Sequence, residues 1–230
     1  MARQRDRFGD WHGEAGFSLA EILMATAISS VVLLALYLLY DINQVTFVKG
    51  EQQADLQQNA RIAMDRIVRE LRLAGFDPQT PPVGCATAIN SATATSVSFI
   101  ADVTSDGTTE KIEYTNPPCI PNCAIDPPKI RREQWESLAG PTCSGSGSGG
   151  AQPFAERVTA LTFTYYDGSN ICLGGAATAD CPAPPAAVPA GSLGNIRRIS
   201  VTITTQDTQT GSKAQPFTLR AEVRPRNLGL

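Results

Sequence analysis

The most constraining feature of the sequence is an apolar run near the amino terminus. It extends over residues 17–40, contains neither Pro nor Gly, and carries a single charged residue, Glu21. A helix rises about 1.5 Å per residue, so a run of this length crosses the roughly 30 Å hydrocarbon core of a bilayer. The sequence therefore predicts one membrane-spanning helix.

The residues before the run predict its orientation. Arg3, Arg5 and Arg7 lie near the start of the chain, and basic flanks stay in the cytoplasm. The remainder of the chain should then lie outside. Ordinary secretory signals place a small-residue cleavage site after the apolar stretch, but none follows here, whereas Gly16 stands directly before it.

Glu21 admits two interpretations. In the first, it is a snorkelling acid one turn from the membrane interface. In the second, the chain is cut after Gly16, and the new α-amino group of Phe17 is largely protonated at neutral pH. Glu21 would then neutralise that amine in its own chain or in a neighbouring subunit, which would make it an assembly residue, because a carboxylate inside a membrane usually has a partner.

The stretch Gly16-Phe17-Ser18-Leu19-Ala20-Glu21, followed by the apolar run, resembles the class III signal of type IV prepilins and type II secretion pseudopilins. The resemblance implies cleavage after Gly16 by prepilin peptidase, N-methylation of Phe17, and Glu21 as the assembly carboxylate. It also implies other minor and major pilins or pseudopilins as partners, an inner-membrane location, and later incorporation into a pilus or pseudopilus. Ala20 replaces the isoleucine that is common in these signals.

Two further segments narrow the resemblance. Residues 59–78 and the closing residues 222–230 resemble PilW-type minor pilins and GspJ-type minor pseudopilins. Shaft-forming pilins commonly carry a proline at the position that Leu38 occupies here. The resemblance thus favours a minor subunit that initiates or caps a filament. Whether that filament serves a pilus, a secretion system or DNA uptake stays open.

The polar stretch after Asp41 should continue the helix as far as Ala74. Apolar residues recur there at intervals of three and four, which predicts a stripe that packs on a core. Gly75 and Pro78 are typical of a helix end, and Gly50 is the weak point of the helix. The stripe comprises Leu56, Ala60, Met64, Ile67, Leu71 and Ala74, and the other faces carry Arg61, Asp65, Arg66, Arg69 and Glu70.

Beyond Pro78, alternating segments predict antiparallel strands with one face buried on the helix stripe. They are 95–103 and 109–115, which flank a turn, and 156–167, 196–206 and 216–225. Residues 144–150 and 182–189 are rich in Gly or Pro and should form surface loops. The expected fold class is α+β, pilin-like: a long amino-terminal helical spine packed on a mainly antiparallel β-sheet domain.

The expected domains are a leader (1–16), the transmembrane half of the helix (17–40), its amphipathic half (41–76) and an extracytoplasmic β-rich domain (77–230). Six cysteines in loop-like contexts favour disulfides formed in an oxidising compartment; zinc is the weaker alternative, since no second close pair and no His accompanies them. Their pairing is open, although a bridge between the last two would close a Gly/Ala-rich segment. They are Cys85, Cys119, Cys123, Cys143, Cys172 and Cys181.

Catalytic chemistry finds little support in the sequence. The only histidine, His12, lies in the leader, which removes the commonest general base from the processed chain. No cofactor, metal or small-molecule substrate is expected, and a net charge of −3 gives no support for direct nucleic-acid binding. Two sets of residues keep a second interpretation open. Asp102, Asp106 and Glu110 suggest calcium but are better explained by a hairpin turn, and Trp135, Phe163, Tyr165 and Tyr166 suggest a ligand surface but are better explained by core packing.

Two function classes follow. The first is a structural subunit of a type IV pilus or secretion pseudopilus and not an enzyme. The second is a binding module that stays monomeric, held in the membrane by its signal anchor. Cleavage after Gly16 distinguishes them, because a simple anchor does not need it.

Overall fold

The computed structural model describes residues 16–79, 83–116, 129–147, 150–206 and 215–228. Its contacts divide the chain into two units, residues 1–48 and 49–230, and each is described by itself. Helix α1 (Leu19–Leu73) contributes residues to both units. It begins two residues later and ends one residue earlier than the sequence predicts, and Gly50 does not interrupt it.

The first unit contains the apolar part of α1. From Gly16 to Val48 nearly every described residue is exposed, including large side chains such as Phe17, Leu33 and Phe47. α1 is long and apolar enough to cross a membrane. A continuous apolar surface of this kind is not stable in water, so it requires lipid or protein around it.

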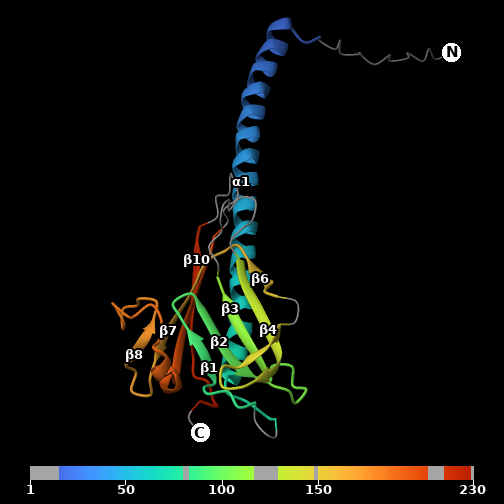
Figure 1. The fold of residues 1–230 in the computed structure, drawn as a ribbon. Coiled ribbons are helices and arrows are strands. Elements are labelled where there is room, and N and C mark those ends of the chain that lie inside the picture. The colour runs from blue at the N-terminus through green and yellow to red at the C-terminus, as the bar shows by residue number, and fades with distance from the viewer. Residues whose placement is uncertain (1–15, 80–82, 117–128, 148–149, 207–214, 229–230) are drawn as a thin grey trace, which may run out of the picture. The chain divides into compact units, whose positions relative to one another are not determined.

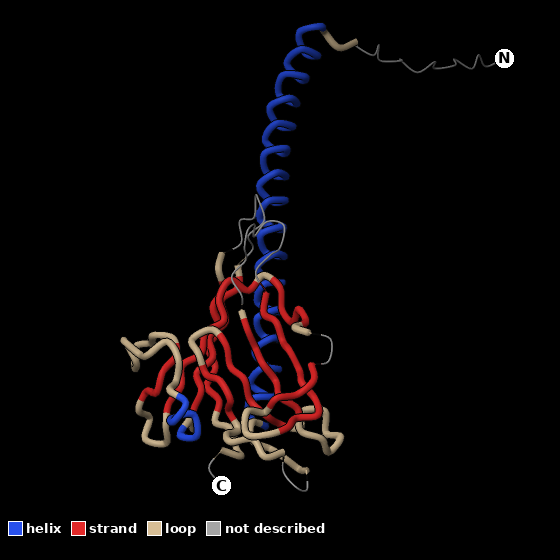
Figure 2. The backbone as a smooth tube through the Cα atoms, viewed as in Figure 1, coloured by secondary structure: helices blue, strands red, loops and turns tan. Residues whose placement is uncertain are grey.

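The second unit combines the last turns of α1 with two antiparallel sheets (Figures 1 and 2). The six-stranded sheet contains β1 (Ile89–Ala92), β2 (Ser96–Ala101), β3 (Glu110–Thr115), β4 (Lys129–Ala139), β5 (Ser144–Gly147) and β6 (Gln152–Glu156), with the last two both paired to β4. The four-stranded sheet has the order β10 (Phe217–Val223), β9 (Arg198–Thr205), β7 (Val158–Tyr166) and β8 (Cys172–Gly175). A short 3-10 helix, η1 (Ala190–Asn195), precedes β9. The sequence predicts five of these strands, in a single sheet. The structure instead has two sheets.

The predicted hairpin is present. β2 and β3 pair in register from Ser96↔Thr115 to Ala101↔Glu110. The turn between them uses left-handed residues, Ser105 with φ 59° and Gly107 with φ 86°. Aspartate–glycine pairs favour such turns because glycine adopts positive φ without steric cost.

A β-bulge decides which side of β7 faces the core. The pairing of β7 with β9 shifts between Val158 and Ala160. Because a bulge inserts one residue, the buried face continues at Leu161 and then alternates through Phe163 and Tyr165. The bulge therefore places Leu161, and not Ala160, inside.

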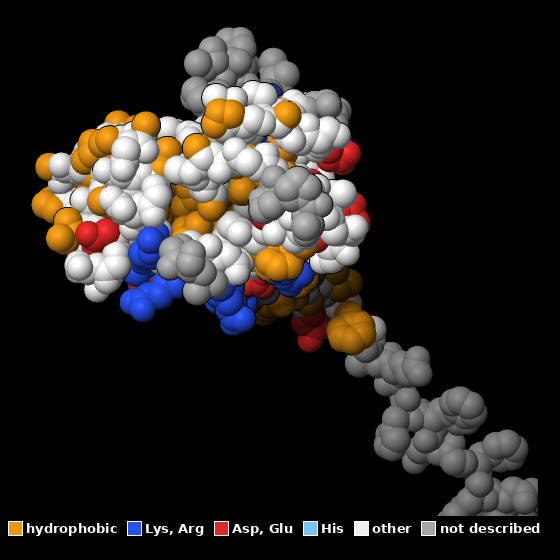
Figure 3. Space-filling model, turned by 60° about the horizontal axis from the view of Figure 1, so that its bottom comes forward, with side chains coloured by type: hydrophobic (Ala, Val, Ile, Leu, Met, Phe, Trp, Pro, Cys, Tyr) orange, Lys and Arg blue, Asp and Glu red, His pale blue; other side chains and the backbone are white. Residues whose placement is uncertain are grey.

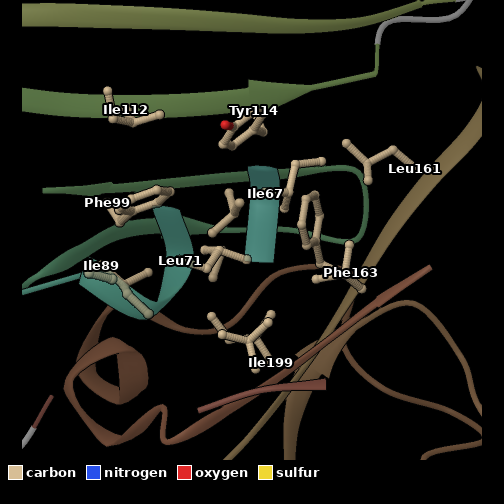
Figure 4. Close-up of a cluster of buried hydrophobic side chains, with 14 of the residues drawn as sticks. Ile67, Leu71, Ile89, Phe99, Ile112, Tyr114, Leu161, Phe163 and Ile199 are labelled. Atoms are coloured by element: carbon tan, nitrogen blue, oxygen red, sulfur yellow. The ribbon is translucent and has the colours of Figure 1, made fainter. Parts of the chain in front are cut away.

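The core joins the helix stripe to both sheets. Figure 4 shows Ile67 and Leu71 of α1 between side chains of β2 and β3 and side chains of β7 and β9. Every member of the predicted stripe is buried, with at most 3% of its surface exposed. Ile199, Val201 and Ile203 of β9 face the same core, as their alternation predicts. The predicted arrangement of an amphipathic helix on antiparallel strands is therefore confirmed.

The helix ends where glycine permits a left-handed turn. Gly75 has φ 87° and its N–H donates to Ile100 O at 2.8 Å. A Cβ at this position would lie 3.0 Å from Asn227 O. Two separate constraints thus favour glycine here, the backbone angle and the close approach of the carboxy-terminal segment.

Three expectations are wrong in this unit. Residues 144–147 form strand β5, because their backbone pairs with the long strand β4; the flexible loop expected from glycine and serine is not there. Trp135 is half-buried under Lys111, 4.6 Å from the ammonium to the ring centroid, and is not a core residue. Glu70 lies inside, not on a solvent face, since three hydrogen-bond donors surround it.

One face of the molecule carries charged side chains of both signs. On the face seen in Figure 3, a small group of Lys and Arg side chains lies beside a few acidic ones, and most of the face is uncharged.

Candidate processing and assembly site

The candidate cleavage site lies just before α1. Gly16 and Phe17 have no regular secondary structure, and the Phe17 side chain is 84% exposed. No atom lies within 4 Å of where a Cβ would stand on Gly16. The peptide bond between them is therefore accessible and is not protected by helical hydrogen bonds.

Ser18 and Glu21 form a reciprocal cap at the start of the helix. The Glu21 N–H donates to Ser18 Oγ at 3.2 Å, and the Ser18 N–H donates back to Glu21 Oε2 at 2.9 Å. The Ser18 hydroxyl also donates to Oε2, at 3.1 Å. This is a capping box, in which two backbone N–H groups that the first helical turn leaves unsatisfied find side-chain acceptors.

The capping box gives Glu21 a role within its own chain. Both hydrogen bonds that the Glu21 carboxylate accepts end on Oε2, and no described residue donates to Oε1. The carboxylate can thus hold the helix start and still accept a hydrogen bond from an amine. The capping box was not among the predictions, although its signal, Ser followed three residues later by Glu before an apolar run, is visible in the sequence.

One helix face beside Glu21 carries small and hydroxyl side chains. It is lined by Phe17, Ile22, Ala25, Thr26 and Ser29. The Thr26 hydroxyl donates to Leu23 O at 3.0 Å, so its polar group is satisfied inside the helix. Small residues on such a face let the backbones of two helices approach closely in a membrane.

The acidic cluster in the β2–β3 turn has a structural explanation. The carboxylates of Asp102, Asp106 and Glu110 lie within 4.8 Å of one another. Asp102 accepts the N–H groups of Ser105 and Gly107, at 2.6 and 3.1 Å. Glu110 accepts the N–H of Val103 at 3.0 Å and the hydroxyl of Thr104 at 2.6 Å. These bonds hold the turn, as the hairpin interpretation predicts.

Two disulfides lie within the described residues. Cys85 is bonded to Cys143, and Cys172 is bonded to Cys181 across the Gly/Ala-rich segment. The first joins the segment before β1 to the turn between β4 and β5 and closes 58 residues. Cys119 and Cys123 lie outside the described residues, as do His12 and residues 1–15 of the proposed leader.

The aromatic residues proposed as an alternative ligand surface do not gather at one exposed site. Phe163, Tyr165 and Tyr166 are fully buried. The Tyr165 hydroxyl donates to Thr93 O and Ser96 O, both at 3.0 Å, and burial raises its pKa well above the ordinary value. These three side chains therefore pack in the core. Of the four aromatic residues in this set, only Trp135 lies partly at the surface.

The comparisons with known proteins concern this same amino-terminal segment. A family model described as the prokaryotic N-terminal methylation motif matches residues 11–37, which include Gly16, Phe17 and Glu21. A search of curated proteins finds no match. The matched motif, the long helix whose amino-terminal half is apolar and the packing of its second half on antiparallel sheets together support a type IV pilin-like protein.

Proposed function

We propose that this chain is a minor pilin or pseudopilin, a structural subunit that initiates or caps a type IV pilus or type II secretion pseudopilus. The observation that carries the proposal is the Gly16–Phe17 junction in an accessible segment, directly before an apolar helix that bears Glu21. Leu38, at the position where shaft subunits commonly have proline, supports a minor role.

The proposed division of the chain follows from this assignment. Residues 1–16 would be the leader that prepilin peptidase removes, and residues 17–40 would cross the inner membrane. Residues 41–76 would continue the helix, and residues 77–230 would form the extracytoplasmic domain. The disulfides fit an oxidising compartment on that side.

Glu21 would act in assembly through the oxygen that the capping box leaves free. Cleavage after Gly16 creates an α-amino group at Phe17, and that group is mostly protonated at neutral pH. Oε1 of Glu21 accepts no hydrogen bond from a described residue, so it offers this amine, or the amine of a neighbouring subunit, an acceptor. In a low-dielectric membrane such a pair is stronger than in water.

The capping box also favours a second candidate function. Because Ser18 already satisfies Glu21 within one chain, a monomeric membrane-anchored binding module would explain the glutamate without any partner. The two candidates differ in what they require of residue 21. Assembly requires a negative charge, whereas a capping box functions with either Glu or Gln at this position.

Three variants separate these candidates by co-purification with filament partners, with the membrane fraction as the control for insertion. If Glu21 is the assembly residue, Glu21→Gln inserts normally but loses co-purification. Ser18→Ala, which keeps the charge and removes the cap, retains co-purification, and Glu21→Ala behaves like Glu21→Gln. Co-purification of Glu21→Gln at the wild-type level would reject the assembly role.

A further inference from the structure

A polar pocket lies beside α1 in the second unit. It has a volume of 280 Å³ and is lined by Arg66 of α1, Arg132 and Gln134 of β4, and Gln152, Pro153 and Phe154 of β6. Strands β4 and β6 are paired, with Arg132 opposite Gln152. The volume is at the lower limit for small-molecule sites, which span roughly 300–1,000 Å³. A group the size of one side chain fits it better than a cofactor.

The charges around the pocket do not balance. Arg66 Nε and Arg132 Nε donate to opposite oxygens of Glu70, each at 3.0 Å. Among the described residues in these contacts, one carboxylate thus serves two guanidinium groups, which leaves one positive charge in excess. Burial alone would lower the pKa of Arg132, but its hydrogen bond and charge interaction with Glu70 outweigh burial and raise that pKa, so Arg132 remains charged.

The guanidinium groups keep donors available. Arg66 uses Nε toward Glu70, and no described residue accepts from its two terminal nitrogens. Arg132 donates from Nη1 to Gln134 Oε1 at 2.9 Å. The Arg66 guanidinium lies over the ring of Phe154, 5.2 Å from the centroid, and that ring packs edge-on against Tyr114. The Arg66 side chain is therefore positioned at the pocket although half of it is exposed.

We infer that this pocket binds a carboxylate side chain supplied by a neighbouring protein chain. A guanidinium group matches a carboxylate in geometry and in its forked donors. The excess of one positive charge matches a monoanion better than a phosphate dianion. The inference rests on the proposed assembly function only for the source of the carboxylate, a partner subunit.

The binding test uses the full chain in detergent micelles, with its arginines labelled by ¹⁵N. The probes are the peptide acetyl-Gly-Glu-Gly-amide and the same peptide with Gln in place of Glu. The Glu peptide should shift the Nε–H resonances of Arg66 and Arg132, and the Gln peptide should not. Equal shifts from both peptides, or none from either, would overturn the inference.

Two variants and a control locate the site. Arg66→Gln should weaken binding of the Glu peptide about tenfold, the usual consequence of losing one charge-assisted hydrogen bond. Gln152→Glu should abolish binding because it supplies the missing negative charge from within the chain. Arg61→Gln, an exposed arginine on the same helix, should leave binding unchanged. Wild-type binding in both pocket variants would show that the peptide binds elsewhere.

Two small anions identify the source of the carboxylate. Succinate and inorganic phosphate should bind more weakly than the Glu peptide; tighter binding of either would mean that the pocket serves a free anion and would overturn the role of a partner chain. Because this assay uses the isolated chain, its failure is distinct from a failure of the Glu21 co-purification test.

Discussion

Replacing Glu70 with alanine should lower the free energy of unfolding of the β-rich unit by about 3–5 kcal/mol, the usual cost of removing one partner from a buried ion pair. Glu70 is 7% exposed and accepts three hydrogen bonds, from Tyr114 Oη at 2.6 Å and from Arg66 and Arg132. Without the carboxylate, the Arg132 side chain, 13% exposed, would keep a charge with no anionic partner among these contacts. The Tyr114 hydroxyl would also lose its acceptor.

The three contacts should contribute unequally. Arg66 is half exposed, so its pair with Glu70 should contribute only a few tenths of a kcal/mol, as exposed helix pairs do. Tyr114 is fully buried, and a hydrogen bond to a charged group contributes about 1.5–3 kcal/mol. Burial and Glu70 also raise the pKa of Tyr114, so the hydroxyl stays protonated and donates throughout the range of the experiment.

Urea unfolding of the full chain in detergent micelles, followed by the circular dichroism of its strands, measures these differences. Tyr114→Phe should cost about 1.5 kcal/mol. The double variant with Glu70→Ala should cost less than the sum of the two, because the residues share one hydrogen bond. Asp65→Ala, an exposed acid on the same helix, is the control and should change stability little. A loss below about 1 kcal/mol for Glu70→Ala would refute the reasoning, since it would mean that solvent reaches the cluster.

Three other predictions concern the same unit. Removing the Cys85–Cys143 disulfide should lower the free energy of unfolding by about 4 kcal/mol, and removing Cys172–Cys181 should lower it by about 2.5 kcal/mol. The longer loop gains more freedom in the unfolded chain, and urea unfolding of the serine variants checks the order. Gly75→Ala should lower the free energy of unfolding by more than the roughly 1–2 kcal/mol expected of Gly84→Ala. Both glycines have positive φ, but only at Gly75 would a Cβ meet a close neighbour. Equal losses in the two variants would contradict this. Burial, opposed by Lys111, raises the pKa of Glu113 above its unfolded value near 4.5, so its contribution to stability is full below that pH and is lost as the pH rises through the folded pKa. Glu113→Gln should therefore raise the free energy of unfolding at pH 7 but not at pH 4, by less than about 1 kcal/mol because the group is only half-buried; urea unfolding at the two pH values checks this.

The helix and its stripe could be predicted because periodicity reports burial directly. Leu56, Met64 and Leu71 recur at helical spacing, and the structure buries each of them. The same reasoning failed for Glu70, one position before Leu71. A charged residue beside an apolar stripe is expected in solvent, and only its partners on β3 and β4, more than 40 residues away, make its burial favourable.

Strands were predictable where alternation is regular and bounded by turns. β4 was missed because polar residues such as Arg132 and Gln134 occupy its inner side, where they line a pocket. β5 was missed because glycine and serine have low strand propensity, and only pairing with β4 makes residues 144–147 extended. The division into two sheets depends on contacts between distant segments, which local pattern does not specify.

At the candidate site, Gly16, Phe17 and Glu21 were predicted from order and spacing alone, and their roles stay predictions. The capping box was not predicted, although the Ser18–Glu21 spacing carries its signal, because a charge in an apolar run equally predicts a partner within the membrane. The carboxylate therefore has two uses to separate, one within the chain and one between chains. The structure of a single chain shows the first directly and supplies a free oxygen for the second.

Mass spectrometry of the protein extracted from membranes tests the central claim most directly. We expect a mature chain of 230 − 16 = 214 residues that begins with N-methylated Phe17. Co-expression with and without a prepilin peptidase provides the control, since the full-length chain should persist when the peptidase is absent. An intact amino terminus in the presence of the peptidase, or a cut beyond Tyr40, would contradict the account.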